Sequence, residues 1–337
     1  MELQILTKQE LMEMERAPKT KADILVDYVV CFLPVLAGAF CLLEYYLLPN
    51  YEINTNTNVY GVFIGIIISL FLAAFIVSFK SKTVFNKLRY KAPFYSFVFI
   101  LLTVYDFLTL KTGTLMLPYF PWADRVLNAM ISDWRYLSDC AKNSLILLFT
   151  GYFSGAILGL ITGIACGYSK KINYWVSPFI KLLGPIPSTT WIPIVMVIMA
   201  SLFKGAVFII ALGVWFSVTI ATITGISSVE ADYFDAAKTL GATSRQLIFG
   251  IAIPYAMPNI LQGLTQGMSS ACTSLMVAEM LGVESGLGWY INWQKSWAEF
   301  SKMYGAIILI CLIFIVVNKV LAIVKKHILK WQEGVVQ

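Results

Sequence analysis

The sequence predicts an all-α protein that crosses a membrane about eight times. Of its 337 residues, 58% are hydrophobic and 13% are charged, whereas a soluble domain carries about 45–50% apolar and about 25% charged residues. The apolar residues also gather into stretches of about 20, the length that an α-helix needs to cross a bilayer. These observations exclude a soluble enzyme, a disordered chain and a nucleic-acid-binding protein that relies on a basic patch.

Eight segments satisfy this length criterion. The fifth differs from the others because Pro185, Pro187 and Pro193 lie near its start, and prolines inside a membrane helix need neighbouring groups to satisfy the freed carbonyls. The predicted spans are 24–48, 59–79, 93–110, 143–168, 186–203, 206–226, 257–283 and 303–324.

Lys and Arg residues gather on one side of these spans. Seventeen of the 25 lie on one side, in the N-terminal segment, in alternate loops or near the C-terminus. Seven lie on the opposite side, and Lys181 lies near a membrane face. Membrane proteins carry an excess of Lys and Arg on the cytoplasmic side. Both termini and the loop at 227–256 are therefore predicted to be cytoplasmic, in agreement with an even number of spans.

The Lys-rich stretch 80–92 predicts a boundary between two regions. Residues 1–90 hold an N-terminal segment and two spans, which a polar outer loop at 49–58 connects. Residues 91–332 hold the other six spans. The first 22 residues mix apolar and charged positions, which fits either a helix lying on the inner membrane surface or a solvated tail.

The loop at about 229–254 carries the most specific pattern. Residues 229–240 are predicted to form a short helix that Gly241 ends, and 243–250 to form a second short helix before Pro254. A plain inter-helix loop is usually shorter. Small residues in this loop would let the backbone of a partner approach, so the pattern favours a docking surface. Its residues are Asp235, Ala236, Ala237, Gly241, Ala242 and Pro254.

This loop resembles the EAA loop in the membrane subunits of binding-protein-dependent ABC importers. That consensus runs Glu-Ala-Ala, three residues, Gly, and a Pro twelve or thirteen residues later. Asp235 replaces the Glu here, which keeps the charge and shortens the reach. The resemblance implies a coupling helix that sits in a cleft of an ATP-binding subunit. The other matching residues are Ala236, Ala237, Gly241, Ile251 and Pro254.

Two further segments resemble the nitrate/sulfonate/taurine-type branch of these importers. Residues 184–193 (GPIPSTTWIP) are similar to its Arg-Pro-Ile-Pro…Ala-Trp-Ile-Pro segment, with Gly184 where the branch often has Arg. Residues 278–281 (AEML) and 286–288 (GLG) are similar to its Ala-Glu-Leu-Ile…Gly-Leu-Gly segment. The resemblance covers about 93–332 and leaves out the first two spans.

The resemblance implies a transport subunit rather than an enzyme. It implies two copies of the chain around a translocation pathway, a pair of ATP-binding subunits on the cytoplasmic loops, and a solute-binding protein at the outer face. ATP and Mg²⁺ would bind to the partner ATPase and no cofactor to this chain, whose sequence lacks a GxxxxGK[ST] phosphate loop. The expected location is the inner or plasma membrane of a bacterium.

Five glycines recur at every fourth position in the span 143–168. Small residues at this spacing let two membrane helices approach closely. These residues are therefore predicted to serve helix packing rather than to contact a solute. They are Gly151, Gly155, Gly159, Gly163 and Gly167.

One side of the span 257–283 is polar. Its hydrogen-bonding residues recur at steps of three and four, which places them on one helix face. Such groups must face protein or water, so they line a translocation pathway or bond a neighbouring helix, and their number favours the pathway. They are Asn259, Gln262, Gln266, Ser269 and Thr273. Glu279, further toward the outer face, is included in the pathway, with a structural hydrogen-bonding role as the alternative.

Two features near the outer face and the C-terminus complete the site analysis. Trp289, Trp293 and Trp297 indicate an interfacial anchor or part of a docking surface for the solute-binding protein. The single histidine, His327, lies in a Lys-rich tail, and the six cysteines show no ligand spacing. No metal site is expected.

Two other function classes remain as alternatives. A secondary transporter would work without an ATPase, but it would usually show several interior carboxylates and broken repeats. Apart from Glu279, the charges in or near the spans each lie close to a span end or alone: Asp27, Glu44, Asp106 and Lys319. A membrane scaffold is the second alternative. Within the permease class, the solute is sulfonate-, taurine- or nitrate-like, or else a vitamin precursor such as an aminopyrimidine.

Overall fold

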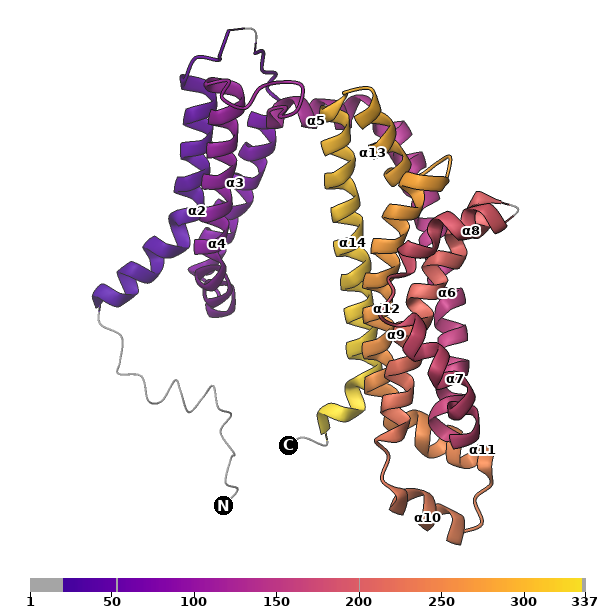
Figure 1. The fold of residues 1–337 in the computed structure, drawn as a ribbon. Helices are drawn as coiled ribbons and strands as arrows, with labels where there is room; N and C mark the ends of the chain where they lie inside the picture. The colour runs from indigo at the N-terminus through magenta and orange to yellow at the C-terminus, as the bar shows by residue number, and fades with distance from the viewer. Residues whose placement is uncertain (1–20, 53, 200, 335–337) are drawn as a thin grey trace. The chain divides into compact units, whose positions relative to one another are not determined.

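The structure is a computed structural model that describes residues 21–52, 54–199 and 201–334. These residues form an all-helical fold (Figure 1). Seven of the described helices are long and apolar enough to cross a membrane, and one bent helix pair raises the number to eight at most. The predicted all-α membrane fold with about eight spans is confirmed. Residues 1–20, with most of the predicted surface helix or tail, lie outside the described residues.

The described residues form two compact units that divide between Asn128 and Ala129, inside helix α5 (Ala123–Ser132). The long helices of the first unit are α2 (Lys21–Leu47), α3 (Val59–Ser78) and α4 (Lys82–Asp106), which a π-helical turn extends over Phe107–Lys111. Their core consists of Cys41, Tyr45, Tyr60, Ile64, Phe99, Leu110 and Trp122.

This division differs from the predicted boundary near residue 90. The third predicted span, assigned to the six-span region, forms α4 and packs against α2 and α3. The Lys-rich stretch 80–92 does not separate two regions, because most of it forms the first turns of α4 after a tight connection at 79–81. Arg89 from this stretch forms an ion pair with Asp27 of α2 at 2.5 Å.

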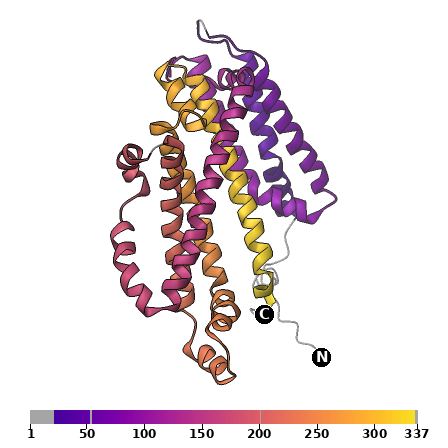
Figure 2. The same cartoon turned by 90° about the vertical axis from the view of Figure 1, so that its right-hand side faces the viewer.

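The second unit contains four long helices that run side by side (Figures 1 and 2): α6 (Trp134–Tyr168), α9 (Leu202–Ser227), α12 (Ile253–Gly282) and α14 (Phe300–Ile328). α9 packs against both α6 and α12. α13 (Leu287–Ser296) lies at one end, where it shares a core with the first turns of α6 and α14. α10 (Ala231–Thr239) lies at the opposite end (Figure 1).

The fifth predicted span is not the continuous helix over 186–203 that the sequence indicates. α7 (Lys170–Leu183) and the segment Ser188–Ile198, which ends in α8 (Ile192–Ile198), form a pair bent by 85°. Pro185 and Pro187 lie at the break. The helix cannot continue regularly through them, because proline lacks the N–H that would bond to the preceding turn. The first half of this bent pair is α7, which the search for apolar stretches did not predict.

Asp133 links the start of α6 to the segments around α13. Its carboxylate accepts a hydrogen bond from the Tyr290 hydroxyl at 2.8 Å and pairs with the Lys302 ammonium at 3.0 Å. Partial burial alone would raise the pKa of Asp133, but the hydrogen bonds from Lys302 and Tyr290 outweigh it and lower this pKa. A carboxyl with a lowered pKa stabilises the fold above its unfolded pKa of about 3.9, and this contribution is lost as the pH falls through the folded value.

We therefore expect Asp133→Asn to lower the melting temperature of the detergent-solubilised protein at pH about 7. The difference from the wild type should shrink at pH about 3, because this pH lies below the unfolded pKa and the unfolded wild-type carboxyl then takes up a proton. Thermal unfolding at both pH values measures it. A difference that stays constant with pH would show that the charge of Asp133 contributes nothing.

Candidate functional site

The loop that resembles the EAA loop is a helix, a tight turn and a second helix that continues into α12. α10 ends where Gly241 adopts φ +83°, a left-handed conformation that favours glycine. The Gly241 N–H bonds the Lys238 carbonyl at 2.9 Å, and the Ala242 N–H bonds the Ala237 carbonyl at 3.0 Å. These two bonds close the C-terminus of α10.

The second helix, α11 (Ser244–Leu247), starts with a capping box. The Gln246 Oε1 atom accepts the backbone N–H of Thr243 at 2.8 Å. A π-helical turn at Ile248–Ala252 then leads into α12. Pro254 has no N–H for the carbonyl four residues earlier, which fits a wider turn just before it. Pro254 thus lies within the first turn of α12 rather than in a free loop.

The surface around α10 is exposed and partly apolar. No residue of α10 is buried, and the side chains of Leu240, Phe249 and Tyr233 are 89%, 70% and 54% exposed. Asp235 pairs with Lys238 at 2.9 Å on the same helix. We call this the coupling surface: Tyr233, Asp235, Ala236, Leu240, Gly241 and Phe249. The sequence analysis did not single out its three large apolar members, although apolar residues in a solvated loop are a usable signal.

Phe234 connects the coupling surface to the helices above it. Its ring packs against a core formed by Ile226 at the end of α9 and by Ala256 and Ile260 of α12. It also lies 6.4 Å, between ring centroids, from Tyr168 at the end of α6. α10 is therefore attached to the ends of three long helices.

Four residues of the predicted polar face lie together on the exposed side of α12 and one is half-buried. Gln262, Gln266, Ser269 and Thr273 are exposed, whereas Asn259 is half-buried. The Gln262 Oε1 atom accepts a hydrogen bond from the Lys325 ammonium at 2.6 Å. The opposite side of α12 is buried against α9. The Ser269 and Thr273 hydroxyls donate to carbonyls of α12 itself. Among the described residues, Lys325 is the only residue outside α12 that hydrogen-bonds to the four exposed side chains of this face.

Glu279 does not belong to this face. It lies six residues beyond Thr273, which is about 240° around the helix, and it is buried. The Ser144 hydroxyl donates to Oε1 at 2.7 Å and the Gly288 N–H donates to Oε2 at 2.7 Å. Ser144 in turn accepts the Leu287 N–H at 2.8 Å. Its placement corrects the prediction that it lines the pathway: Glu279 joins α6, α12 and the start of α13.

The five glycines of α6 face α9. A Cβ added to Gly151 would lie 2.6 Å from the Ile210 Cβ, and one added to Gly163 would lie 2.6 Å from the Thr222 Cβ. Contacts this short do not occur between real side chains, so only glycine lets the two backbones approach so closely. The other three glycines make the corresponding approaches to α9: Gly155 to Val214, Gly159 to Val218 and Gly167 to Ile226.

The break between α7 and α8 borders a small pocket of about 120 Å³. Hydroxyl groups of Ser188, Ser217 and Ser270 line it, and the Ser188 and Ser274 hydroxyls are 2.8 Å apart. A Cβ at Gly184 would collide with the Phe216 ring. The Arg that the related branch often carries at this position would therefore need Phe216 to move.

The three tryptophans of the outer segment form an aromatic row. The Trp289 and Trp293 rings stack at 5.4 Å between centroids, and the Trp293 and Trp297 rings are 6.0 Å apart. Trp293 and Trp297 are exposed. Both predicted roles, an interfacial anchor and a docking surface, require such exposure.

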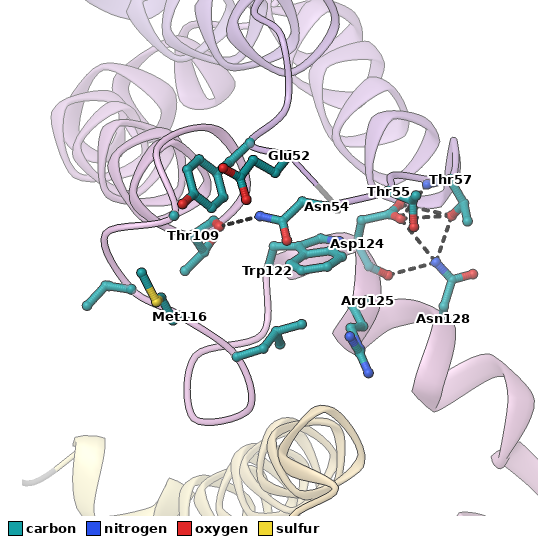
Figure 3. A pocket seen from close by; sticks show the side chains of 14 residues that line it. Glu52, Asn54, Thr55, Thr57, Thr109, Met116, Trp122, Asp124, Arg125 and Asn128 are labelled. Atoms are coloured by element: carbon teal, nitrogen blue, oxygen red, sulfur yellow. Dashed lines mark hydrogen bonds between the residues drawn. The ribbon is translucent and has the colours of Figure 1, made fainter.

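The first unit has a larger pocket of about 520 Å³ near the end of α2 and the start of α3 (Figure 3). The Asp124 carboxylate beside it accepts hydrogen bonds from the backbone N–H groups of Thr57 at 2.6 Å and Tyr60 at 3.0 Å. The Arg125 guanidinium lies over the Trp122 ring, 5.6 Å from its centroid. The sequence analysis placed no site here, because the lining residues come from loops and from the ends of helices and form no periodic pattern. Among the described residues, no group of three or more His, Cys, Asp or Glu side chains could hold a metal ion.

Residues 155–333 match the profile of the binding-protein-dependent transport system inner membrane component. This segment holds the C-terminal part of α6, the bent pair α7–α8, the coupling surface, α12 and α14. The chain belongs to this family. The predicted resemblance to its nitrate/sulfonate/taurine branch is confirmed by relatives named for these solutes.

Three relatives illustrate the similarity. The chain is 29% identical over 140 residues to a protein of Methanocaldococcus jannaschii named as an ABC transporter permease, covering 40% of this chain and 52% of the relative. It is 32% identical over 107 residues to the aliphatic sulfonates transport permease SsuC of Bacillus subtilis, covering 32% and 39%. It is 29% identical over 104 residues to the nitrate import permease NrtB of Synechococcus elongatus, covering 31% and 37%. The matches span about half or less of the relatives' lengths.

The fold is also similar to that of a solved transporter. An inward-facing structure of the MetNI methionine ABC transporter superposes with a TM-score of 0.50 at 18% identity. The superposition covers 58% of this chain and 98% of that chain. At this identity the similarity concerns the fold alone.

Proposed function

We propose that this chain is the permease subunit of an ATP-driven importer of a small solute. The coupling surface is the observation that carries the proposal. It combines an exposed helix, small residues at its tip and large apolar side chains that no described part of the chain covers. An exposed surface of this kind marks an interaction site, and its position matches the loop that docks ATP-binding subunits in the family.

Packing contacts connect this surface to the membrane-spanning helices of the second unit. A partner that moves α10 also moves the ends of α9 and α12 through Phe234. α9 is packed along the glycines of α6, so α6, α9 and α12 would respond as one body. The exposed polar face of α12 would then shift relative to a second copy of the chain. We propose a homodimer in which the two faces line the translocation pathway, with a solute-binding protein at the α13 end.

This arrangement assigns the two ends of the second unit. The α10 end is proposed to be cytoplasmic, together with both termini, and ATP and Mg²⁺ are proposed to bind the partner subunits. A secondary transporter is not favoured, because it would have no use for the coupling surface. Solute uptake by proteoliposomes that lack the ATP-binding subunit would support that alternative instead.

For the solute, we propose a small anion such as a sulfonate or nitrate. The exposed face of α12 offers neutral amide and hydroxyl donors, Lys325 lies beside Gln262, and the face contains no carboxylate among the described residues. Calorimetry on the solute-binding protein that copurifies with this chain separates the candidates. Binding of taurine, another sulfonate, nitrate or bicarbonate supports the anion, whereas binding of only an aminopyrimidine moves the solute to vitamin precursors.

We expect Gly241→Arg to reduce copurification of the ATP-binding subunit at least about tenfold. A long charged side chain at the tip of the coupling surface would block close approach, and Arg tolerates the left-handed backbone of Gly241 poorly. Gly241→Asn is the matched control, because Asn is short and adopts this conformation more readily. Both variants should elute as monodisperse protein. Equal copurification with Gly241→Arg would contradict the coupling role.

A further inference from the structure

Two carboxyl groups face each other inside the first unit. Glu44 of α2 and Asp106 at the end of α4 interact with each other. Asp106 is 0% exposed and Glu44 is 7% exposed. Apart from the other carboxyl of the pair, no group in the described part of the chain hydrogen-bonds to their four carboxyl oxygens. Buried carboxylates without donors are rare, because the cost of removing them from water is large.

The surrounding groups supply only one positive charge to this pair. Lys111, in the π-helical turn that follows Asp106, acts on both carboxyls. Its ammonium donates to the Tyr45 and Leu48 carbonyls at 2.6 and 2.9 Å and to the Asn50 Oδ1 atom at 2.9 Å. These three acceptors hold the ammonium in place and leave no donor of Lys111 for the carboxyls.

The other titratable groups around the pair are already bonded. The Cys41 thiol of α2 and the Tyr60 hydroxyl of α3 are 3.3 Å apart and bond each other. The Tyr45 hydroxyl donates to the Thr57 carbonyl. Asp124 of α5 accepts bonds from Thr57 and Tyr60. None of these groups neutralises the second carboxylate.

One proton balances the charge of the carboxyl pair against Lys111 and gives the pair a hydrogen bond. If both acids were ionised, two carboxylates and one ammonium would leave one net negative charge buried between helices. Two carboxyls that face each other do not both ionise, and a proton bound by one gives an O–H that the other accepts. A metal ion fits less well, because the Lys111 ammonium would repel it and no described cluster of acidic, Cys or His side chains could hold one.

We propose that Glu44 and Asp106 bind a single shared proton between α2 and α4. The site lies outside the segment that matches the transporter family. A result against this proposal would therefore not count against the proposed import function. It also lies close to the 520 Å³ pocket of Figure 3. Trp122 lines that pocket and belongs to the same core as Tyr45 and Tyr60.

Infrared difference spectra of the purified full-length chain test this proposal. In Glu44→Gln, Asp106 is left alone with Lys111 and should ionise; in Asp106→Asn, Glu44 should do the same. Each single variant is therefore expected to lose the whole protonated-carboxyl absorption of the pair. The matched control is Asp27→Asn, since Asp27 forms an ion pair with Arg89 outside the carboxyl pair and its replacement should leave this absorption unchanged. Glu279 is present in every sample and cancels in the differences.

Three results separate the possibilities. Loss of half of the absorption in each variant would mean that each acid carries its own proton, and no loss in either would mean that both are ionised; both results overturn the proposal. Lys111→Met should instead raise the absorption about twofold, because without the ammonium both acids must be neutral. Gel filtration checks the fold. If Lys111→Met fails to fold, the Gln and Asn variants, which match the protonated acids in shape, still decide.

Discussion

A Gly159→Leu variant is expected to accumulate little or no folded protein in the membrane. Gly159 lies in the middle of the α6 glycines, where an added Cβ would lie 2.8 Å from the Val218 Cβ and 3.0 Å from the Trp215 carbonyl oxygen. Overpacking costs about 1–3 kcal/mol when side chains can adjust. Here a backbone carbonyl of α9 is in the way, so the two helices must separate and the cost should lie at or above the upper end of that range.

Gly65→Leu is the matched control for this prediction. Gly65 also lies inside a membrane-length helix, α3, but an added Cβ there meets nothing within 4 Å. We expect the control to elute and melt like the wild type. Gel filtration of fluorescently tagged protein and its melting temperature measure both variants. A Gly159→Leu protein with wild-type yield and melting temperature would show that α6 and α9 are not packed through the glycines.

Glu279→Leu is expected to cause the second largest loss of stability. Leucine fills a similar volume but accepts no hydrogen bond, so the Gly288 N–H and the Ser144 hydroxyl lose the partner that they have in the wild type. Each buried polar group left without a partner costs about 1–3 kcal/mol. The melting temperature should therefore fall by several degrees.

Glu279→Gln separates this structural role from a role in transport. The Gln carbonyl can still accept one of the two hydrogen bonds, so its melting temperature should lie between those of the wild type and Glu279→Leu. Uptake per folded molecule should remain close to that of the wild type, because Glu279 lies away from the exposed polar face of α12. A Gln variant with wild-type stability but without uptake would support a role of Glu279 in the translocation pathway.

Local features of the chain were predictable from the sequence. The second predicted span, 59–79, is the helix Val59–Ser78, because the need to place about 20 apolar residues in lipid is a property of the segment itself. The stop of α10 at Gly241 was predictable for a similar reason: a glycine after a helical pattern is a local backbone signal. The step of four between the glycines of α6 likewise indicates a face, although it does not name the helix that covers it.

The tertiary structure decided which elements come together. Hydropathy predicts that α4 is apolar, but only packing shows that it covers α2 and α3. Proline content marks the fifth span, whereas the 85° bend and the role of α7 emerge from the fold.

For the charged residues, too, the sequence does not show which side chains meet in the fold. Glu44 and Asp106 lie 62 positions apart and each looks isolated in the sequence, whereas the fold places them against each other. Glu279 resembles a continuation of the polar face, but the turn of the helix carries it to Ser144. A sequence records what each side chain is able to bond; which partner it meets depends on contacts between distant segments, and those are made only when the helices pack.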